Sequence, residues 1–317
     1  MAEILVVLRR ARDMVITVFI VASVMFFLLH AIPGSPAIAI LGTNAPLESI
    51  EQLNRQLGFG KPVWEQYASW LWNALHGDLG FSLSQSRGVA SAIADFMVPT
   101  LLVAAIAMVL SVLLAVPLAV RTVSHPSALL SRVLLFLSSA LLAVPGFWLA
   151  LVLVLFFAVR IRAFPVSGYV APTEDLWSFT HHVFLAVVVL LAYQVPLLVL
   201  TLRESLAGEL LNAYARTARA KGGTERDVMY RHLLRNGFMP TLTVLGSNFS
   251  HMLGGVIILE TIFSIPGLGY LLNSAIGSRD YNLVLGITLF TVVVTILVNL
   301  TVDLLYAVLD PRVRSSR

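Results

Sequence analysis

Long uncharged stretches rich in Leu, Val, Ile and Ala are the dominant pattern of this chain. A helix needs about 20 apolar residues to cross the hydrocarbon core of a bilayer, and only a helix or a closed barrel satisfies its own backbone groups there. The pattern predicts an all-α protein with six membrane-spanning helices, over Met14 to Ile32, Phe96 to Val120, Val133 to Val159, Val183 to Leu202, Gly237 to Leu259 and Asn282 to Val302. We expect the last helix to continue to residue 308.

Prolines lie inside three of the predicted spans, at Pro117, Pro145 and Pro196. A proline removes a backbone donor and clashes with the preceding turn, so we expect a kink at each position. Because proline is common in membrane helices, the alternative is ordinary packing irregularity.

The first span resembles a secretory signal, since Arg9, Arg10 and Arg12 precede it. Its apolar run is longer than the roughly 7–15 residues of a signal peptide, and Ala31-Ile32-Pro33-Gly34 is a poor cleavage site. We therefore expect an uncleaved first helix.

Composition agrees with a membrane protein. Of the 317 residues, 58% are hydrophobic and only 12% are charged, whereas soluble domains carry about 25% charged residues. The mean hydropathy is +0.88. The net charge of +4 gives no basis for a nucleic-acid partner, and the absence of cysteine excludes disulfides, thiolate metal sites and cysteine nucleophiles.

Basic residues are distributed unevenly between the two sides of the predicted bundle. If residues 1–13 lie in the cytoplasm, fifteen of the 21 Lys and Arg residues fall on the inner side and six on the outer side. The positive-inside rule therefore predicts that both termini are cytoplasmic. In this orientation the long loop over residues 33–95 is extracytoplasmic, and its aromatic residues indicate a small cap on the membrane surface, with a helix around Glu65 to Trp70.

The loop over residues 203–236 is the most basic part of the chain and is predicted to be cytoplasmic. Leu210 to Lys221 favours a helix, Gly222-Gly223 ends it, and the Thr224 hydroxyl can cap a second helix at Asp227. One interpretation is an amphipathic segment on anionic lipid headgroups. The other is a rigid element that docks into a cytoplasmic partner.

The sequence of this loop resembles the "EAA" loop of ABC importer permeases of the dipeptide/oligopeptide/nickel family. The matching residues are Tyr214-Ala215-Arg216-Thr217-Ala218-Arg219-Ala220-Lys221-Gly222, followed by Arg231-His232-Leu233-Leu234-Arg235-Asn236 and Pro240. Further stretches agree in order and spacing: Pro33-Gly34-Ser35-Pro36, Gln66-Tyr67, Trp70-Leu71, Gly77 to Ser82, Glu260 to Gly269 and Asp310-Pro311-Arg312-Val313-Arg314.

The sequence departs from the family pattern at four points. Arg216-Thr217 stands where the general motif has Glu-Ala, and the spacing from Gly222 to Pro240 is longer than the general version. Gly223 stands where this branch often has a bulkier residue, and Gly88 stands where a proline is common. The departures leave the resemblance intact, because the other matching stretches keep their order and spacing.

The resemblance implies a type I ABC importer permease fold over residues 96–308, in the bacterial inner membrane. It implies a second similar permease, two cytoplasmic ATPase subunits that bind the loop, and a periplasmic or lipid-anchored solute-binding protein. The long outer loop is similar to that of the first ("B") of two permeases. ATP and Mg²⁺ would be bound by the ATPase subunits, and this chain lacks their GxxxxGK[ST] motif and would be non-catalytic.

Polar residues within the spans are candidates for the solute pathway or its gate. Thr291, Thr295, Asn299 and Asp303 recur every four residues and fall along one helical stripe. Asn248 and His251 accompany a ridge of small residues in the fifth span, and Glu260 ends it. The alternatives are helix packing with interhelical hydrogen bonds, and, for Glu260, a structurally paired carboxylate.

Other functions have less support in the sequence. His30 and His181-His182 lack metal-ligand spacing, and no HExxH or GxSxG motif indicates a membrane hydrolase. A passive channel would not need a shaped basic loop. Glu260 and Asp303 lie near opposite faces, which disfavours a proton-coupled carrier. Peptides are the expected solute, and nickel or a metal chelate is the alternative.

Overall fold

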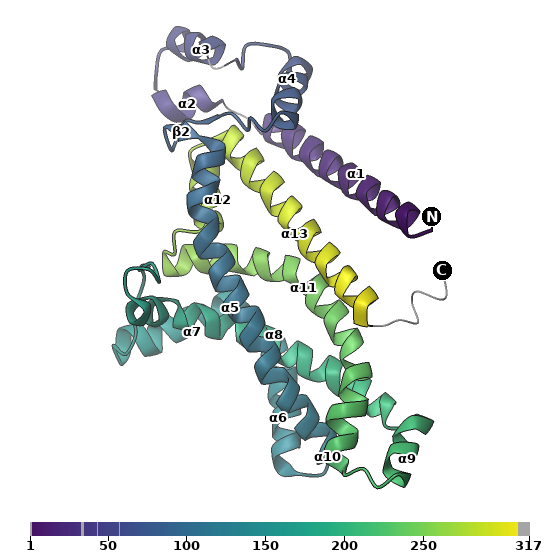
Figure 1. Cartoon of the computed structure of the whole chain (residues 1–317). Helices are drawn as coiled ribbons and strands as arrows, with labels where there is room; N and C mark the ends of the chain where they lie inside the picture. Colours follow the sequence, from purple (N-terminus) through teal and green to yellow (C-terminus); the bar gives the residue numbers. More distant parts are fainter. Residues whose placement is uncertain (1, 33–34, 43, 57, 310–317) are drawn as a thin grey trace. The chain divides into compact units, whose positions relative to one another are not determined.

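The computed structural model describes residues 2–32, 35–42, 44–56 and 58–309, and these are mostly helical (Figure 1). The α-helices of more than three residues are α1 (Ala2–Ala31), α2 (Pro36–Leu41), α3 (Leu47–Gln56), α4 (Val63–Leu75), α5 (Val89–Ser124), α6 (Leu129–Leu142), α7 (Gly146–Leu153), α8 (Leu176–Glu209), α9 (Ala213–Ala220), α11 (Leu234–Phe263), α12 (Leu268–Gly277) and α13 (Tyr281–Leu309). A short α10 (Glu225–Asp227) and two π-helices, η1 (Val154–Arg160) and η2 (Val228–Leu233), complete the helical elements.

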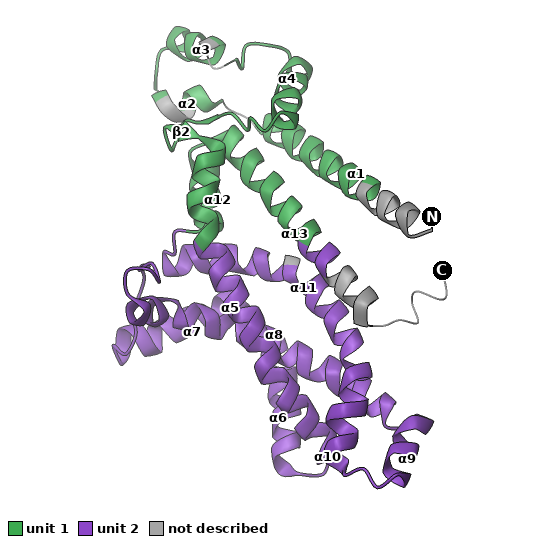
Figure 2. Ribbon diagram, in the orientation of Figure 1, with its two compact units in different colours: residues 1–98, 267–297 green, residues 99–266, 298–317 purple. Residues whose placement is uncertain are grey.

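The matched stretches Pro33-Gly34 and Asp310 to Arg314 lie outside the described residues, as do the side chains of Ser250 and Asp303. The described chain divides into two compact units, coloured separately in Figure 2. Unit 1 comprises Met1–Val98 and Gly267–Leu297, and unit 2 comprises Pro99–Pro266 and Val298–Arg317.

Unit 1 is built around the packing of α1 against α4. The Phe26 ring lies 5.2 Å from the Tyr67 ring and 5.7 Å from the Trp70 ring, measured between centroids, and Ser23 Oγ lies 2.6 Å from the Tyr67 hydroxyl. As the sequence predicts, Glu65 to Trp70 is helical. The buried core adds residues of α5, α12 and α13: Val89, Ala92, Ile93, Leu268, Leu271, Ala275, Leu283, Val284, Leu285 and Ile287.

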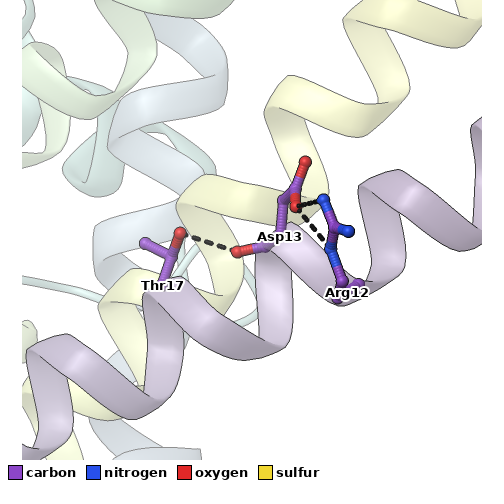
Figure 3. Close-up of polar contacts among 3 residues, drawn as sticks. All are labelled: Arg12, Asp13 and Thr17. Carbon is purple, nitrogen blue, oxygen red and sulfur yellow. Dashed lines mark hydrogen bonds and ion pairs between the residues drawn. The ribbon is translucent and has the colours of Figure 1, made fainter.

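The apolar part of α1 begins after a local polar cluster. Arg12 forms an ion pair with Asp13 at 2.7 Å, and the Thr17 hydroxyl donates to the Asp13 carbonyl oxygen at 2.8 Å (Figure 3). No charged residue follows in α1, which is why the span-forming part of the helix starts here.

A short antiparallel hairpin in unit 1 is fixed to the start of α13. Strands β1 (Phe81–Ser82) and β2 (Arg87–Gly88) pair with Phe81 opposite Gly88. Asp280, only 2% exposed, accepts hydrogen bonds from Ser82 Oγ at 2.7 Å and from the Ser84 backbone N at 2.9 Å. Its other oxygen accepts from the Leu283 backbone N at 3.2 Å, so one carboxylate holds the hairpin and caps α13.

Unit 2 is organised around α8, which packs against α6, α7 and α11. Midway along α8, the buried Gln194 side chain accepts a hydrogen bond at 2.9 Å from the Asn248 amide of α11. Leu198, Val199, Leu245 and Ala115 form an apolar cluster. An interhelical amide bond of this kind satisfies polar groups that lipid cannot.

Four described helices are long and apolar enough to cross a membrane, or up to six if each bent pair counts as one span. The predicted span over 133–159 is not one straight helix, because α6 and α7 meet at 104°. Pro145 caps α7 in an extended conformation, and a proline also disfavours helical backbone in the residue before it. By contrast, Pro117 and Pro196 lie inside helices that continue through them.

Helix ends also differ from the apolar boundaries. The structure extends the predicted span 183–202 to Leu176–Glu209, since the helix continues through polar residues at both ends. The fifth predicted span lies in α11, which bends by 46° between Phe249 and His251. Hydropathy reports the apolar part of a helix, whereas caps and turns determine where the helix ends.

Candidate functional site

The basic loop, residues 203–236, folds into a helical hairpin made of α9, α10 and η2. Both α9 and α10 contact η2, which continues directly into α11. The buried side of the hairpin forms an apolar cluster with α5 and α8: Ala119, Val120, Leu202, Leu206, Ala215, Val228, Met229 and Leu233. The loop is therefore a packed element joined to two long helices.

Two glycines form the turn between α9 and α10. Gly222 has φ of +82°, in the left-handed region that favours glycine, and the Gly223 backbone N donates to the Ala218 carbonyl oxygen at 3.1 Å. A Cβ atom at Gly223 would lie 2.9 Å from that same oxygen. The glycine pair that the sequence predicts as a helix break therefore makes a tight, defined turn.

An ion pair spans this turn. Arg219 Nε and Nη2 donate to the two carboxylate oxygens of Glu225 at 2.8 and 3.2 Å. The hydrogen bond from Arg219 lowers the pKa of Glu225 below its ordinary value, and the pKa of Arg219 is raised in return. The bidentate geometry holds the end of α9 to the start of α10.

The predicted cap on α10 is present. The Thr224 hydroxyl accepts from the Asp227 backbone N at 3.2 Å. The same hydroxyl donates to Asp227 Oδ2 at 2.5 Å, and this hydrogen bond lowers the pKa of Asp227. The carboxylate thus contacts the hydroxyl that caps its own backbone N–H.

Tyr214 joins the hairpin to the end of α8. Its hydroxyl donates to the Glu209 carboxylate, which also accepts from Asn212 Nδ2 at 2.6 Å. Partial burial, then the hydrogen bond to Glu209, raises the pKa of Tyr214. Tyr214 therefore holds the start of α9 to the end of α8.

The predicted coupling residues divide between two sides of the hairpin. Ala215 is buried, and Tyr214, Ala218 and Arg219 are half-buried. The exposed set is Arg216, Thr217, Ala220, Lys221, Gly222, Arg231 and His232. Within the described residues Arg216 and Lys221 take part in no ion pair, whereas the charge of Arg231 helps to lower the pKa of Asp227. The exposed surface therefore carries positive charge at Arg216 and Lys221.

The candidate pathway residues are less uniform. Asn248 is buried against Gln194, whereas His251 is exposed, although both lie on α11. Thr295 and Asn299 are half-buried on α13. A pathway role for these residues stays a prediction, and the Asn248 contact also fits the interhelical alternative.

Glu260 is completely buried near the end of α11. The Thr100 hydroxyl of α5 donates to Glu260 Oε1 at 2.6 Å. The Glu260 carbonyl oxygen also accepts from the Ile265 backbone N at 2.9 Å, across the left-handed Ser264. The paired-carboxylate interpretation has direct support from this geometry, and it is compatible with a role at a gate.

Sequence reasoning missed several of these partners. Gln194 lies in the middle of an uncharged span, which by itself indicates a structural or functional amide. Thr100 carries a similar but weaker signal. Asp280 gave none, because its partners Ser82 and Ser84 are almost 200 residues away in the chain.

The histidines have local partners. His30 Nδ1 lies 2.8 Å from the Phe26 carbonyl oxygen, His181 Nε2 lies 2.7 Å from the Ala163 carbonyl oxygen, and His182 Nδ1 lies 2.7 Å from the Ser178 carbonyl oxygen. Over the part of the chain that the structure describes, no three His, Asp or Glu side chains are grouped as metal ligands.

Comparison with known proteins identifies the chain at the level of family. Residues 107–315 match the model of the binding-protein-dependent transport system inner membrane component, and residues 3–104 match the model of its N-terminal part. A "Putative peptide transport system permease protein" of Brucella abortus is 34% identical over 97% of this chain and 98% of its own length. The glutathione transport system permease protein of Escherichia coli O6:H1 is 33% identical over the same shares.

These matches cover the apolar helices, the basic loop and the long loop together. The two family models together match nearly the whole chain. A membrane component of a transport system is also consistent with the membrane-length helices described above. The chain therefore belongs to the binding-protein-dependent transport system inner membrane component family, as a multi-pass permease subunit of an ABC importer in the bacterial inner membrane.

Proposed function

We propose that this chain pairs with a second, similar permease to form a translocation pathway for peptides, as the first of the two permeases in its system. Two cytoplasmic ATPase subunits bind the exposed side of the basic loop, and a solute-binding protein delivers the peptide from outside. Both termini lie in the cytoplasm. Relatives named as peptide and glutathione permeases, at 33–34% identity over 97% of the chain, support this solute class.

The packed helical hairpin is the observation that carries the proposal. Its turn is fixed by Gly223 and by the Arg219–Glu225 ion pair, and its apolar side packs onto α5 and α8. A hairpin of this kind transmits a displacement to the helices beneath it, whereas a flexible basic segment on lipid would absorb it. The exposed Arg216 and Lys221, which form no ion pair within the described residues, provide a contact surface for an acidic partner.

Force then has a continuous route through this chain. Since η2 runs into α11 without a break, movement of the hairpin moves the start of α11. Glu260 lies in the last turn of α11 and is tied to Thr100 of α5. In the proposed cycle the partner subunits supply the chemistry of ATP hydrolysis. This chain binds no ATP and catalyses no reaction.

Nickel or a metal chelate is the alternative solute within the same architecture. Uptake of labelled dipeptides and of labelled nickel by membranes containing the full system separates the two. We expect uptake of the labelled dipeptide, reduced by unlabelled peptide but not by nickel. Uptake of nickel that peptides do not reduce would instead identify the metal as the solute.

A photo-crosslinking residue in place of Lys221 tests the partner assignment. In the assembled transporter we expect it to capture an ATPase subunit, because Lys221 is exposed beside the glycine turn. The control places the same photo-crosslinking residue at position 55, because Arg55 is exposed on α3 in the predicted outer loop. It should capture no ATPase subunit. Absence of any ATPase adduct at Lys221, or an equal yield at Arg55, contradicts the proposal.

A further inference from the structure

Helix α4 has three sides of different chemistry. One side packs against α1 and contains Tyr67 and Trp70. A second side is exposed and polar, and it contains Ser69 and Asn73. The third side is exposed and apolar. We call this third side the apolar stripe, and it consists of Trp64, Ala68, Trp72 and Leu75.

The apolar stripe follows from helix periodicity. Its members succeed one another at intervals of four, four and three residues, which places them along one line of an α-helix. Trp64 is 67% exposed, Trp72 is 65% exposed and Leu75 is 74% exposed. The Trp72 ring keeps this exposure although it lies 4.5 Å from the His76 ring. Contiguous exposed apolar surface marks contact with a membrane or with another protein.

The stripe adjoins an exposed apolar surface of α1. Tyr67 lies at the edge of the stripe, because it comes three residues after Trp64 on the helix. The Tyr67 ring lies 5.1 Å from that of Phe27, which is itself 47% exposed. Tyr67 and Phe27 therefore join the stripe to the exposed apolar side chains of α1, which include Ile20, Val24 and Leu28.

This surface of α1 belongs to the membrane-length part of the helix, Arg12–Ala31. Ser23, whose Oγ lies 2.6 Å from the Tyr67 hydroxyl, is eight residues before Ala31, or about 12 Å along the helix axis. Helix α4 therefore contacts the last turns of the membrane-length part, and Figure 1 shows it at that end of α1. Exposed apolar side chains in these turns face lipid, and the stripe continues their surface.

The polar side of α4 has a different environment. Gln66, Ser69 and Asn73 line a pocket of about 240 Å³ in unit 1. The other walls of the pocket include Lys61, Asp78 and Tyr281. A polar pocket of this size holds water. Helix α4 thus separates a hydrated side from an apolar side, as a helix at a membrane–water interface does.

The side chains of the stripe favour such an interface. Two of its four members are tryptophans, and tryptophan is enriched at the boundary between headgroups and hydrocarbon. Its indole has an apolar body and a polar N–H that can face the headgroups. Helix α4 contains no Lys or Arg, so its contact with lipid needs no anionic headgroup.

We propose that the apolar stripe of α4 is embedded in the phospholipid interface, in the leaflet that surrounds the Ala31 end of α1. The contact anchors the loop over residues 33–95 to the membrane beside its first helix. It goes beyond the proposed function, and only the identity of the leaflet, the outer one, rests on the orientation proposed above.

Two adjacent small residues give a matched test. Ala68 lies on the apolar stripe and Ser69 on the polar side, both are exposed, and the chain has no cysteine of its own. Ala68→Cys and Ser69→Cys each receive a nitroxide label in the assembled transporter, with cysteine-free partner subunits, in phosphatidylcholine nanodiscs. Electron paramagnetic resonance then measures how strongly each label is relaxed by oxygen, which partitions into lipid, and by a water-soluble nickel chelate.

We expect the ratio of oxygen accessibility to nickel accessibility to be several-fold higher at position 68 than at position 69. Equal ratios would place the stripe in water and overturn the proposal. Exclusion of both reagents from position 68 would show that a protein surface covers the stripe, and it overturns the proposal as well. If this exclusion appears only after the solute-binding protein is added, that protein is the occupant. Neither measurement depends on transport or on which side the loop faces, so the proposed function is tested separately.

Tryptophan fluorescence tests the stripe without an introduced cysteine. The double variant Trp64→Phe/Trp72→Phe removes both indoles of the stripe and keeps an aromatic ring at each position. The emission that the wild-type transporter has and this variant lacks should be quenched by brominated phosphatidylcholine more strongly than by aqueous iodide. Trp70→Phe is the control, because Trp70 packs against α1 and its emission should be quenched less by the brominated lipid. Stripe emission that iodide quenches and brominated lipid leaves unchanged contradicts the proposal.

Discussion

Gly223 is the residue at which the shape of the basic loop is most constrained. Its amide donates to the Ala218 carbonyl oxygen, and there is no room for a side chain beside that oxygen. Neither contact can relax through a side-chain rotation, because both involve backbone. The close approach of two backbone segments therefore explains why glycine stands at this position.

Gly223→Ala should destabilise the hairpin, since the new Cβ would lie 2.9 Å from a backbone oxygen. We expect a loss of about 1–3 kcal/mol, as for other overpacked sites, and reduced uptake at normal expression. Thermal unfolding of the purified protein and a transport assay measure the two effects. Gly208→Ala is the control: no atom lies within 4 Å of its Cβ position in α8, so its stability should be unchanged or higher.

Equal melting temperatures for the two glycine variants would show that the turn is not constrained as described. Reduced uptake without any change in stability would place the effect in partner contact instead.

Buried polar residues of unit 2 likewise contact partners on other helices. Gln194 and Glu260 lie inside the apolar interior of unit 2, where an unpaired amide or carboxylate is strongly unfavourable. Each has its hydrogen-bonding partner on a different helix, Asn248 for Gln194 and Thr100 for Glu260. These contacts specify how the helices align as well as adding stability.

At the scale of elements, the ion pair between α9 and α10 gives a pH dependence with a definite sign. The Arg219 hydrogen bond lowers the pKa of Glu225, so the stabilisation is present at neutral pH and above the carboxyl's ordinary titration range. It is lost only as the pH falls through the lowered pKa. The hairpin should therefore be insensitive to pH between neutral and mildly acidic conditions.

Arg219→Gln should raise the pKa of Glu225 towards its ordinary value, because the principal cause of the shift is removed. Carboxyl ¹³C NMR of glutamate-labelled protein measures the titration, with Glu225→Gln for assignment. Arg226→Gln is the control, since Arg226 contributes to the pKa of Asp227 and not to that of Glu225. A Glu225 titration that is the same in both arginine variants would contradict the ion pair. The effect of Arg219→Gln on the stability of the protein should be small, as for the loss of other exposed ion pairs.

The α6–α7 break shows what separates a hydrophobic stretch from a helix. The residues between Val133 and Val159 are uniformly apolar, and hydropathy alone predicts one span there. The structure turns the chain by 104° at Pro145. Proline was recognised in the sequence, but how far a chain bends at a proline depends on the elements packed around it.

At the scale of the whole molecule, the positive-inside distribution of charge predicts the orientation of the chain. The chain has no cysteine, so Lys221→Cys and Arg55→Cys each introduce a single thiol. In intact spheroplasts a membrane-impermeant maleimide should label the thiol at position 55, and label the thiol at position 221 only after the membrane is permeabilised. Labelling in the reverse order would place the basic loop outside and remove the proposed ATPase contact.

The amino-acid sequence by itself determined the membrane class, the helical content, the basic hairpin and the family. Each of these depends on local signals: uncharged runs of helical length, a glycine pair, a Thr224 cap and short motifs in a fixed order. Local patterns survive in the structure because backbone hydrogen bonds and caps join residues a few positions apart.

Only the tertiary structure decided which distant residues meet. Asp280 holds Ser82, Thr100 pairs with Glu260, and Trp70 and Tyr281 line the same pocket. None of these pairs has a sequence signature, because helix periodicity fixes the face of a residue but not the neighbour that the face meets. The neighbour is chosen by the packing of the whole unit, which depends on residues far apart in the chain.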